Sequence, residues 1–211
     1  MTKHLVVFDV DSTLIEEEAI ELLAEFSGTR LEVAEITTRA MAGEIDFSTS
    51  LIERVALLKG LDESVLLDVA NSLTPTRGAK ELIDLIHETD GYAAAVSGGF
   101  IQLLDPLKKQ LGLDFAKANT LEVLEGKLTG KVTGQLVDSQ VKAETLLTLA
   151  QELNVETDRT IAIGDGANDL KMMRVAGLSI AFCAKQIVRD QADVVLETRN
   201  LELIGAFLPK A

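Results

Sequence analysis

The chain has 211 residues, enough for one domain with an insertion or for two small domains that share a core. Hydrophobic residues make up 47% and charged residues 26% of the composition, which is ordinary for a folded protein and argues against disordered and fibrous classes. The 34 acidic residues against 20 basic ones give a formal charge of -14, which would repel a nucleic-acid backbone, so we expect no nucleic-acid partner.

The sequence favours a protein of the reducing cytoplasm. Cys183 is the only cysteine, so no intrachain disulfide can form. The first residues show no signal-peptide pattern, and no apolar run approaches the ~18 residues of a membrane span, so we expect no membrane partner. We expect a monomer or a homodimer. Because the chain is acidic, any phosphate site must supply local positive charge or backbone N–H groups.

Strand-like apolar runs alternate with helical patterns along most of the chain. The strand-like runs are 5–8, 92–96, 160–163, 180–183 and 194–196, and helical spacing is found in 76–90, 101–112, 139–153 and 168–176. This alternation predicts an α/β fold with a Rossmann-like, doubly wound parallel sheet. Polar clusters follow the first three strand-like runs and would meet at the carboxyl edge of the sheet, where ligands bind in such folds.

Two segments break the alternation. Residues 16–74 contain helical spacing in four places but no convincing strand, so we interpret them as a helical cap domain inserted into a core formed by 1–15 and 75–211. Residues 117–137 alternate in polarity around Glu125 and Gly126, which predicts a small antiparallel β-hairpin.

Asp9 and Asp11 form the first polar cluster. Such a pair, taken alone, is more often a turn or a helix cap. As a catalytic pair, Asp9 would be ionised at neutral pH, since its unperturbed pKa is ~3.9, and could attack phosphorus without a general base. Asp11 would need a raised pKa, from repulsion by Asp9 or from partial desolvation, to protonate a leaving alkoxide. It could later take a proton from the hydrolytic water.

The second cluster and a separate lysine offer groups that suit phosphate. The hydroxyl of Ser97 and the N–H group of Gly98 could face phosphate oxygens, although a Ser-Gly-Gly stretch alone is more often a plain turn. Lys142 stands near the start of a predicted helix, where its ammonium group could neutralise a phosphate. A lone lysine in that place is usually a solvated surface residue.

The third cluster contains Asp165, Asn168 and Asp169, directly after a strand-like run. Oxygen ligands of this kind suit Mg²⁺. A hairpin turn at Asp165 is the alternative, but it fits poorly because the sequence that follows is helical. Together the clusters predict a phosphoryl-transfer site in which Asp9 is the nucleophile and Mg²⁺ bridges it to a phosphate oxygen.

The stretches 8–14, 96–100 and 164–169 resemble those of the phosphoserine phosphatases of the haloacid dehalogenase superfamily, and the resemblance extends over nearly the whole chain. It implies hydrolysis of O-phospho-L-serine to L-serine and phosphate through a phosphoaspartate, the last step of serine biosynthesis. It implies Asp9, the backbone carbonyl of Asp11 and Asp165 as Mg²⁺ ligands. It also makes Asn168 a contact of the substrate phosphate and Asp169 a supporting carboxylate beside the metal.

The resemblance places four further substrate contacts in the cap, at Glu18, Met41, Phe47 and Arg54. Arg54 could bind the amino-acid carboxylate through its planar fork, and Glu18 could bind the ammonium group. Phe47 and Arg54 are seven residues apart and would share one face of a helix. Each has a plainer alternative: cap core for Met41 and Phe47, a surface charge for Arg54, and a helix-start acid for Glu18. One of the two preceding glutamates could also take the contact from Glu18.

Three other functions stay open at this level. A related phosphatase or phosphotransferase would act on another small monoester, because the core sets the chemistry and the cap sets the substrate. A signalling receiver also uses a doubly wound sheet and a phosphorylated aspartate, but it needs no lid, whereas a hydrolase gains from excluding water. A passive divalent-ion binder would leave Ser97 and Lys142 unexplained.

Overall fold

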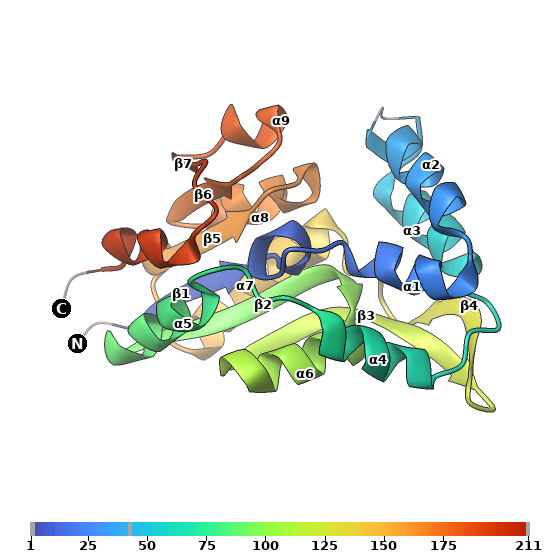
Figure 1. Cartoon of the computed structure of the whole chain (residues 1–211). Coiled ribbons are helices and arrows are strands. Elements are labelled where there is room, and N and C mark those ends of the chain that lie inside the picture. Colours follow the sequence, from blue (N-terminus) through green and yellow to red (C-terminus); the bar gives the residue numbers. More distant parts are fainter. Residues whose placement is uncertain (1–2, 42–43, 210–211) are drawn as a thin grey trace.

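The computed structural model describes residues 3–41 and 44–209, and its centre is a seven-stranded sheet with the order β4-β3-β2-β1-β5-β6-β7 (Figure 1). The strands are β1 (His4–Phe8), β2 (Gly91–Phe100), β3 (Phe115–Leu124), β4 (Lys127–Thr133), β5 (Thr160–Gly164), β6 (Leu178–Phe182) and β7 (Val194–Leu196). Every neighbouring pair is parallel except β3 and β4, which form an antiparallel hairpin. The predicted α/β fold and hairpin are therefore confirmed.

Helices cover both faces of the sheet because side chains of a strand alternate between its faces. Val6 and Phe8 of β1 belong to one buried cluster, and Leu5 and Val7 belong to the other. The first cluster includes residues of α5 (Ala79–Glu88), α6 (Ile101–Leu111) and the last turns, Leu201–Phe207. The second includes residues of α7 (Ser139–Glu152), α8 (Leu170–Val175) and the short α9 (Gln186–Arg189). In the described part of the chain, no helix has the length and apolarity needed to cross a membrane.

The central position of β1 creates the binding edge of the sheet. Phe8 pairs with Ala95 of β2 on one side and with Ile163 of β5 on the other. β1 therefore lies between β2 and β5, and the chain reaches these two strands by separate crossover connections. At such a switch point the loops beyond the carboxyl ends of the strands diverge and leave room for a ligand.

In the described part of the chain, four α-helices are inserted between β1 and α5: α1 (Ala19–Ser27), α2 (Arg30–Met41), α3 (Phe47–Ala56) and α4 (Ser64–Ser72). The two chain segments that lead into and out of this insertion lie side by side, since Ile15 pairs with Pro75 and the N–H group of Glu16 donates to the carbonyl of Thr74 at 3.0 Å. Figure 1 shows α1, α2 and α3 on the side of the molecule away from β6, β7 and α9. Phe47 and Arg54 of α3 line one cavity with Asp9 and Asp165, which follow β1 and β5, so the insertion faces the carboxyl edge of the sheet.

β2 is longer than the sequence analysis expected, and the prediction that this strand closes before Ser97 is wrong. The strand continues through Gly98 and Gly99 to Phe100, and its register with β3 shifts between Val96 and Phe100. Glycines inside a strand are typical of such an irregularity, because no side chain holds the regular pleat there. The expected loop is therefore a bulged strand end.

Candidate active site

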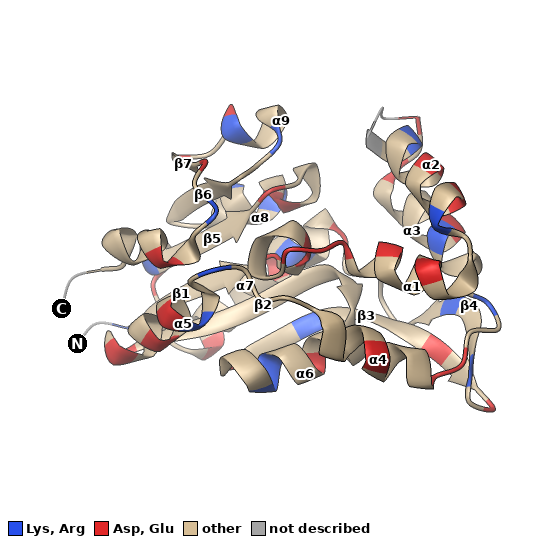
Figure 2. Ribbon diagram, viewed as in Figure 1, with Lys and Arg blue, Asp and Glu red and all other residues tan. Residues whose placement is uncertain are grey.

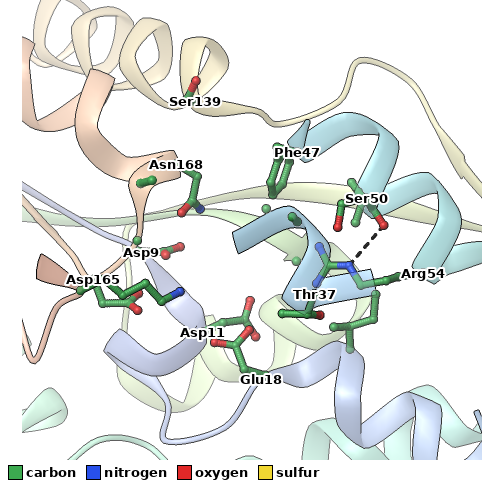
Figure 3. A pocket seen from close by; sticks show the side chains of 18 of the residues that line it. Asp9, Asp11, Glu18, Thr37, Phe47, Ser50, Arg54, Ser139, Asp165 and Asn168 are labelled. Carbon is green, nitrogen blue, oxygen red and sulfur yellow. Dashed lines mark hydrogen bonds between the residues drawn. The ribbon is translucent and has the colours of Figure 1, made fainter. Parts of the chain in front are cut away.

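Asp9 is the first residue after β1 and lies at the switch point of the sheet. Its N–H group donates to the carbonyl of Ile163 at 2.9 Å, which extends the pairing with β5 by one residue, and its side chain is buried. The turn that follows reverses the chain at Ser12, a non-glycine residue in the left-handed region with φ 56°. This turn brings Asp11 to the same cavity as Asp9 (Figure 3).

Lys142 ties Asp9 to Asp169 from inside the protein. Its Nζ atom donates to Oδ1 of Asp9 at 2.6 Å and to Oδ1 of Asp169 at 2.7 Å, and its side chain is fully buried. Burial lowers the pKa of Lys142, but the charges of Asp169 and Asp9 raise it more, so the pKa lies above its ordinary value. Lys142 therefore stays an ammonium ion and balances part of the carboxylate charge.

Asp9, Asp165 and Asp169 form a carboxylate cluster that carries more negative charge than Lys142 balances. One oxygen atom from each residue lies within 4.8 Å of the others. Burial, followed by the charge of Asp169, raises the pKa of Asp9 well above its ordinary range and raises that of Asp165 to about 7. A divalent cation among these oxygens would remove the repulsion, and hard oxygen ligands suit Mg²⁺. The residues therefore fit a metal ion.

Asp169 also holds the loop that presents Asp165. Its Oδ2 atom accepts hydrogen bonds from the N–H groups of Asp165 at 3.2 Å and of Gly166 at 3.0 Å. Its Oδ1 atom is the one that meets Lys142. With both oxygens engaged, Asp169 fixes the positions of its neighbours from a fully buried site.

Asp11 is placed to hold a proton near neutral pH. Its Oδ1 atom accepts from the N–H group of Ala19 at 2.8 Å, and its Oδ2 atom accepts from Oγ of Ser97 at 3.4 Å. Burial, followed by the charge of Glu18, raises the pKa of Asp11 to about 6. Burial, which the sequence analysis named as one of two alternatives, is thus the larger cause, and the like charge that adds to it is that of Glu18 and not that of Asp9.

The bulged end of β2 brings the cap close to the core. Oγ of Ser97 accepts from the N–H group of Gly99 at 2.8 Å, and Asn119 donates to the carbonyl of Gly98 at 2.8 Å. A Cβ atom on Gly98 would lie 2.6 Å from Cζ of Phe47, so only glycine lets the first residue of α3 approach the strand this closely. This contact makes Phe47 part of the site.

A cavity of about 630 Å³ lies between the carboxyl edge of the sheet and the cap helices (Figure 3). This volume suits a small metabolite. Its wall includes most of the residues that the sequence analysis selected: Asp9, Asp11, Glu18, Phe47, Arg54, Gly98, Asp165 and Asn168. Ser97, Lys142 and Asp169 are buried and are not part of this wall. Met41 is the last residue of α2, and its side chain lies outside the described part of the structure.

The charged cap residues reach the cavity from two elements. Glu18 immediately precedes α1 and accepts a hydrogen bond from Oγ of Ser12 at 2.8 Å. Arg54 lies on α3, where its Nε atom donates to the carbonyl of Ser50 at 3.2 Å. α3 begins at Phe47, so Phe47 and Arg54 do lie on one helix and both contribute to the wall. Figure 3 shows Glu18 and Arg54 directed into the same space in front of Asp11.

The wall also contains residues that were not selected from the sequence, among them these five: Thr37, Ser50, Ser139, Lys185 and Ile187. Two of them carried a usable signal. Ser50 lies one helical turn before Arg54, and Lys185 follows β6 as the selected clusters follow β1, β2 and β5. The hydroxyl group of Ser50 is buried and has no hydrogen-bond partner among the described residues. The other three had no chemical pattern that distinguishes them from surface residues.

Comparison with known protein families and sequences gives one consistent result. The family model of haloacid dehalogenase-like hydrolases matches residues 3–177. A phosphoserine phosphatase from Streptococcus thermophilus is 53% identical over 190 residues, which cover 90% of this chain and 88% of the relative. One from Methanocaldococcus jannaschii is 43% identical and covers 98% of both chains. One from Streptomyces coelicolor is 50% identical, but this chain spans only 49% of its length.

Solved structures agree with the sequences. A phospho-aspartyl intermediate analogue of phosphoserine phosphatase superimposes with a TM-score of 0.94 at 42% identity, covering 99% of this chain and 100% of the other. A substrate-bound phosphoserine phosphatase complex gives the same TM-score at 41% identity and the same coverage. The similarity therefore extends over both the sheet and the inserted helices.

Proposed function

The chain belongs to the family of haloacid dehalogenase-like hydrolases, and from this premise we propose that it hydrolyses O-phospho-L-serine to L-serine and phosphate through a phosphoaspartate on Asp9. The observation that carries the proposal is the contact of Lys142 with both Asp9 and Asp169 beneath a cavity that Asp11, Glu18 and Arg54 also reach. This set provides a nucleophile, a proton donor and two groups that complement an amino acid.

Asp9 and Asp11 divide the two half-reactions between them. In the first, a carboxylate oxygen of Asp9 attacks phosphorus, the bond from phosphorus to the serine oxygen breaks, and Asp11 gives its proton to that oxygen. In the second, Asp11 takes a proton from water as the water oxygen attacks phosphorus, and the bond to Asp9 breaks to release phosphate. The pKa of Asp11, about 6, suits a group that must donate and then accept.

Four residues would bind the phosphoryl group. We assign this role to the hydroxyl of Ser97, the N–H group of Gly98, the ammonium of Lys142 and the amide of Asn168. Ser97 and Lys142 are buried directly behind the carboxyl groups of the wall, where Ser97 donates to Asp11 and Lys142 donates to Asp9. Donors fixed in advance stabilise the charge of the transition state without reorganisation.

Asp9, Asp165 and the backbone carbonyl of Asp11 would hold Mg²⁺, with Asp169 as the supporting carboxylate. When bound, this ion supplies positive charge that neutralises the carboxylates and the phosphate together. The excess negative charge of the cluster supports the assignment.

We assign residues 16–74 to a cap domain that selects the leaving group. Arg54 would bind the carboxylate of the substrate as a planar fork, and Glu18 would bind its ammonium group. Met41 and Phe47 would supply the apolar contacts between them. We also place the reaction in the cytoplasm, because the chain has a single cysteine. Its similarity to phosphoserine phosphatases supports a role in the last step of serine biosynthesis.

A phosphate-release assay with a panel of monoesters tests this function. In the presence of Mg²⁺, L-phosphoserine should be hydrolysed with a clearly higher kcat/KM than sugar phosphates or p-nitrophenyl phosphate, because only it offers both charges that Glu18 and Arg54 complement. Removal of the metal with a chelator should abolish the activity, and added Mg²⁺ should restore it. Comparable turnover of sugar phosphates would reject the substrate and favour a related phosphatase of the same family.

A further inference from the structure

The cavity has an unusual balance of charge for a site that must receive a phosphate. Its wall carries four carboxyl groups, from Asp9, Asp11, Glu18 and Asp165. Among the described residues, only Arg54 and Lys185 contribute cationic side chains to that wall. The whole chain adds a formal charge of -14. A dianionic monoester therefore approaches a negative protein and a largely negative cavity, which slows association.

Two other cations lie near the cavity, Lys142 and Arg54, and neither is available to an incoming phosphate on the core side of the cavity. The ammonium group of Lys142 is fully buried and already donates to Asp9 and Asp169. Arg54 lies on the cap, where it is assigned to the amino-acid carboxylate. Lys185 is the remaining cation of the described cavity wall, and it follows β6, the neighbour of the strand β5 that Asp165 follows.

The backbone holds Lys185 firmly at this place. It follows β6 and directly precedes α9, with its own N–H group donating to the carbonyl of Asp165 at 3.1 Å. Its carbonyl accepts from the N–H groups of Val188 at 2.9 Å and Arg189 at 3.1 Å. The residue is therefore fixed on both sides while its side chain stays exposed.

The ammonium group of Lys185 makes no hydrogen bond and no ion pair with any other residue in the described part of the chain. A cation on a rigid backbone, lining the cavity and lacking a partner, is available to a ligand.

We infer that Lys185 is a substrate-binding residue whose ammonium group receives the phosphoryl oxygens of the incoming monoester at the core side of the cavity. The inference rests on the proposed phosphatase activity but not on the identity of the leaving group. Lys185 and Arg54 then have separate partners, the phosphoryl group for Lys185 and the carboxylate for Arg54. Loss of the Lys185 ammonium group should therefore weaken the binding of every monoester alike.

The kinetic test compares Lys185→Gln with the unaltered enzyme at saturating Mg²⁺, using L-phosphoserine and p-nitrophenyl phosphate. We expect kcat/KM to fall about tenfold for both substrates, as for loss of a charged hydrogen bond, mostly through KM. Because added salt screens the net repulsion between the substrate and the protein, kcat/KM should rise with salt, and this rise should be steeper in the variant, which has lost one attractive charge. Lys185→Arg should retain most of the activity.

Lys109→Gln is the matched control, since Lys109 is an exposed residue of α6 and its loss changes the net charge equally. It should leave both kinetic constants unchanged. If Lys185→Gln also leaves them unchanged, or if only L-phosphoserine is affected, the inference is wrong. Failure of the unaltered enzyme to prefer L-phosphoserine would reject the proposed substrate alone, because p-nitrophenyl phosphate still reports on Lys185.

A binding measurement separates substrate contact from an effect on the metal. Isothermal titration of Lys185→Gln with Mg²⁺ alone should give an affinity equal to or higher than that of the unaltered enzyme, because a cation near Asp165 has been removed. Titration of the Mg²⁺-loaded variant with inorganic phosphate should give weaker binding. Weaker Mg²⁺ binding, or unchanged phosphate binding, would overturn the assignment.

Discussion

Asp9 and Asp11 lie two residues apart, yet their surroundings suit them to different tasks. Lys142 donates to Asp9 at 2.6 Å and favours its ionised form, although burial and the neighbouring carboxylates oppose this. Asp11 faces Glu18, and its pKa of about 6 allows a proton to be held. The difference depends on Lys142, which is 133 residues from Asp9, and on Glu18, which the turn after β1 brings back to Asp11.

The substitution Asp11→Asn tests this division. It should lower kcat for L-phosphoserine by about 10²- to 10⁴-fold, the usual contribution of a general acid. With p-nitrophenyl phosphate, whose leaving group needs no proton, formation of the phosphoenzyme should persist while its hydrolysis slows, so a burst of nitrophenolate should precede slow turnover. Stopped-flow absorbance measures both phases. Equal losses with the two substrates and no burst would show that Asp11 is not the proton donor.

For single residues, the sequence identified the members of the site where a chemically suitable side chain also followed a predicted strand. Asp9, Asp11, Asp165 and Asn168 follow strand-like runs and all reach the cavity. The sequence could not indicate that Glu18 faces Asp11, because that contact depends on how the turn after β1 folds. Ser50 and Lys185 escaped selection, because their signals, one helical turn before Arg54 for Ser50 and a place after a predicted strand for Lys185, depend on position alone and not on a recognisable motif.

α7 is the element that brings a cation to the catalytic aspartate. Asp138 caps its first turn, because one carboxylate oxygen accepts from the N–H groups of Gln140 and Val141, both at 2.9 Å. The carbonyl of Asp138 also accepts from the N–H group of Lys142 at 2.9 Å. The start of the helix, and with it the base of the Lys142 side chain, is therefore fixed by this cap.

Asp138→Ala should consequently affect stability and catalysis together. Loss of the cap should cost about 1 kcal/mol of unfolding free energy. For a chain of this size, that corresponds to a decrease in Tm of about 2–4 °C. Differential scanning calorimetry measures the decrease in Tm. The variant's kcat should also fall severalfold, because the side chain of Lys142 is held less firmly. Asp138→Asn keeps a capping oxygen and is the control. An unchanged Tm in the alanine variant would show that the cap is not needed.

Element prediction succeeded where local periodicity sufficed and was wrong at the end of β2. The helical spacing of 139–153 matches α7, and that of 101–112 matches α6. β2 runs on through Gly98 and Gly99 to Phe100, which pairs with Asn119 of β3 after a shift of register. Local sequence favours a turn at two glycines, and only the neighbouring strand shows that the backbone stays extended.

On the scale of the whole molecule, the site exists because the sheet brings distant segments to one edge. Asp9 and Lys142 are 133 residues apart in the chain, and Asp11 and Ser97 are 86 apart. The alternation of strands and helices predicted a parallel sheet. It could not predict that the cap is tied to the hairpin, where the N–H group of Gly60 donates to the carbonyl of Leu128 at 2.8 Å.

The central claim is that Asp9 carries the phosphoryl group between the two half-reactions. The most direct measurement is peptide mass spectrometry of enzyme quenched in acid during steady turnover of L-phosphoserine with Mg²⁺. We predict one phosphoryl group on Asp9, and none in the Asp9→Asn variant, which should also lose turnover. A phosphoryl group on another residue, or sustained turnover by Asp9→Asn at a rate near that of the unaltered enzyme, would contradict the account.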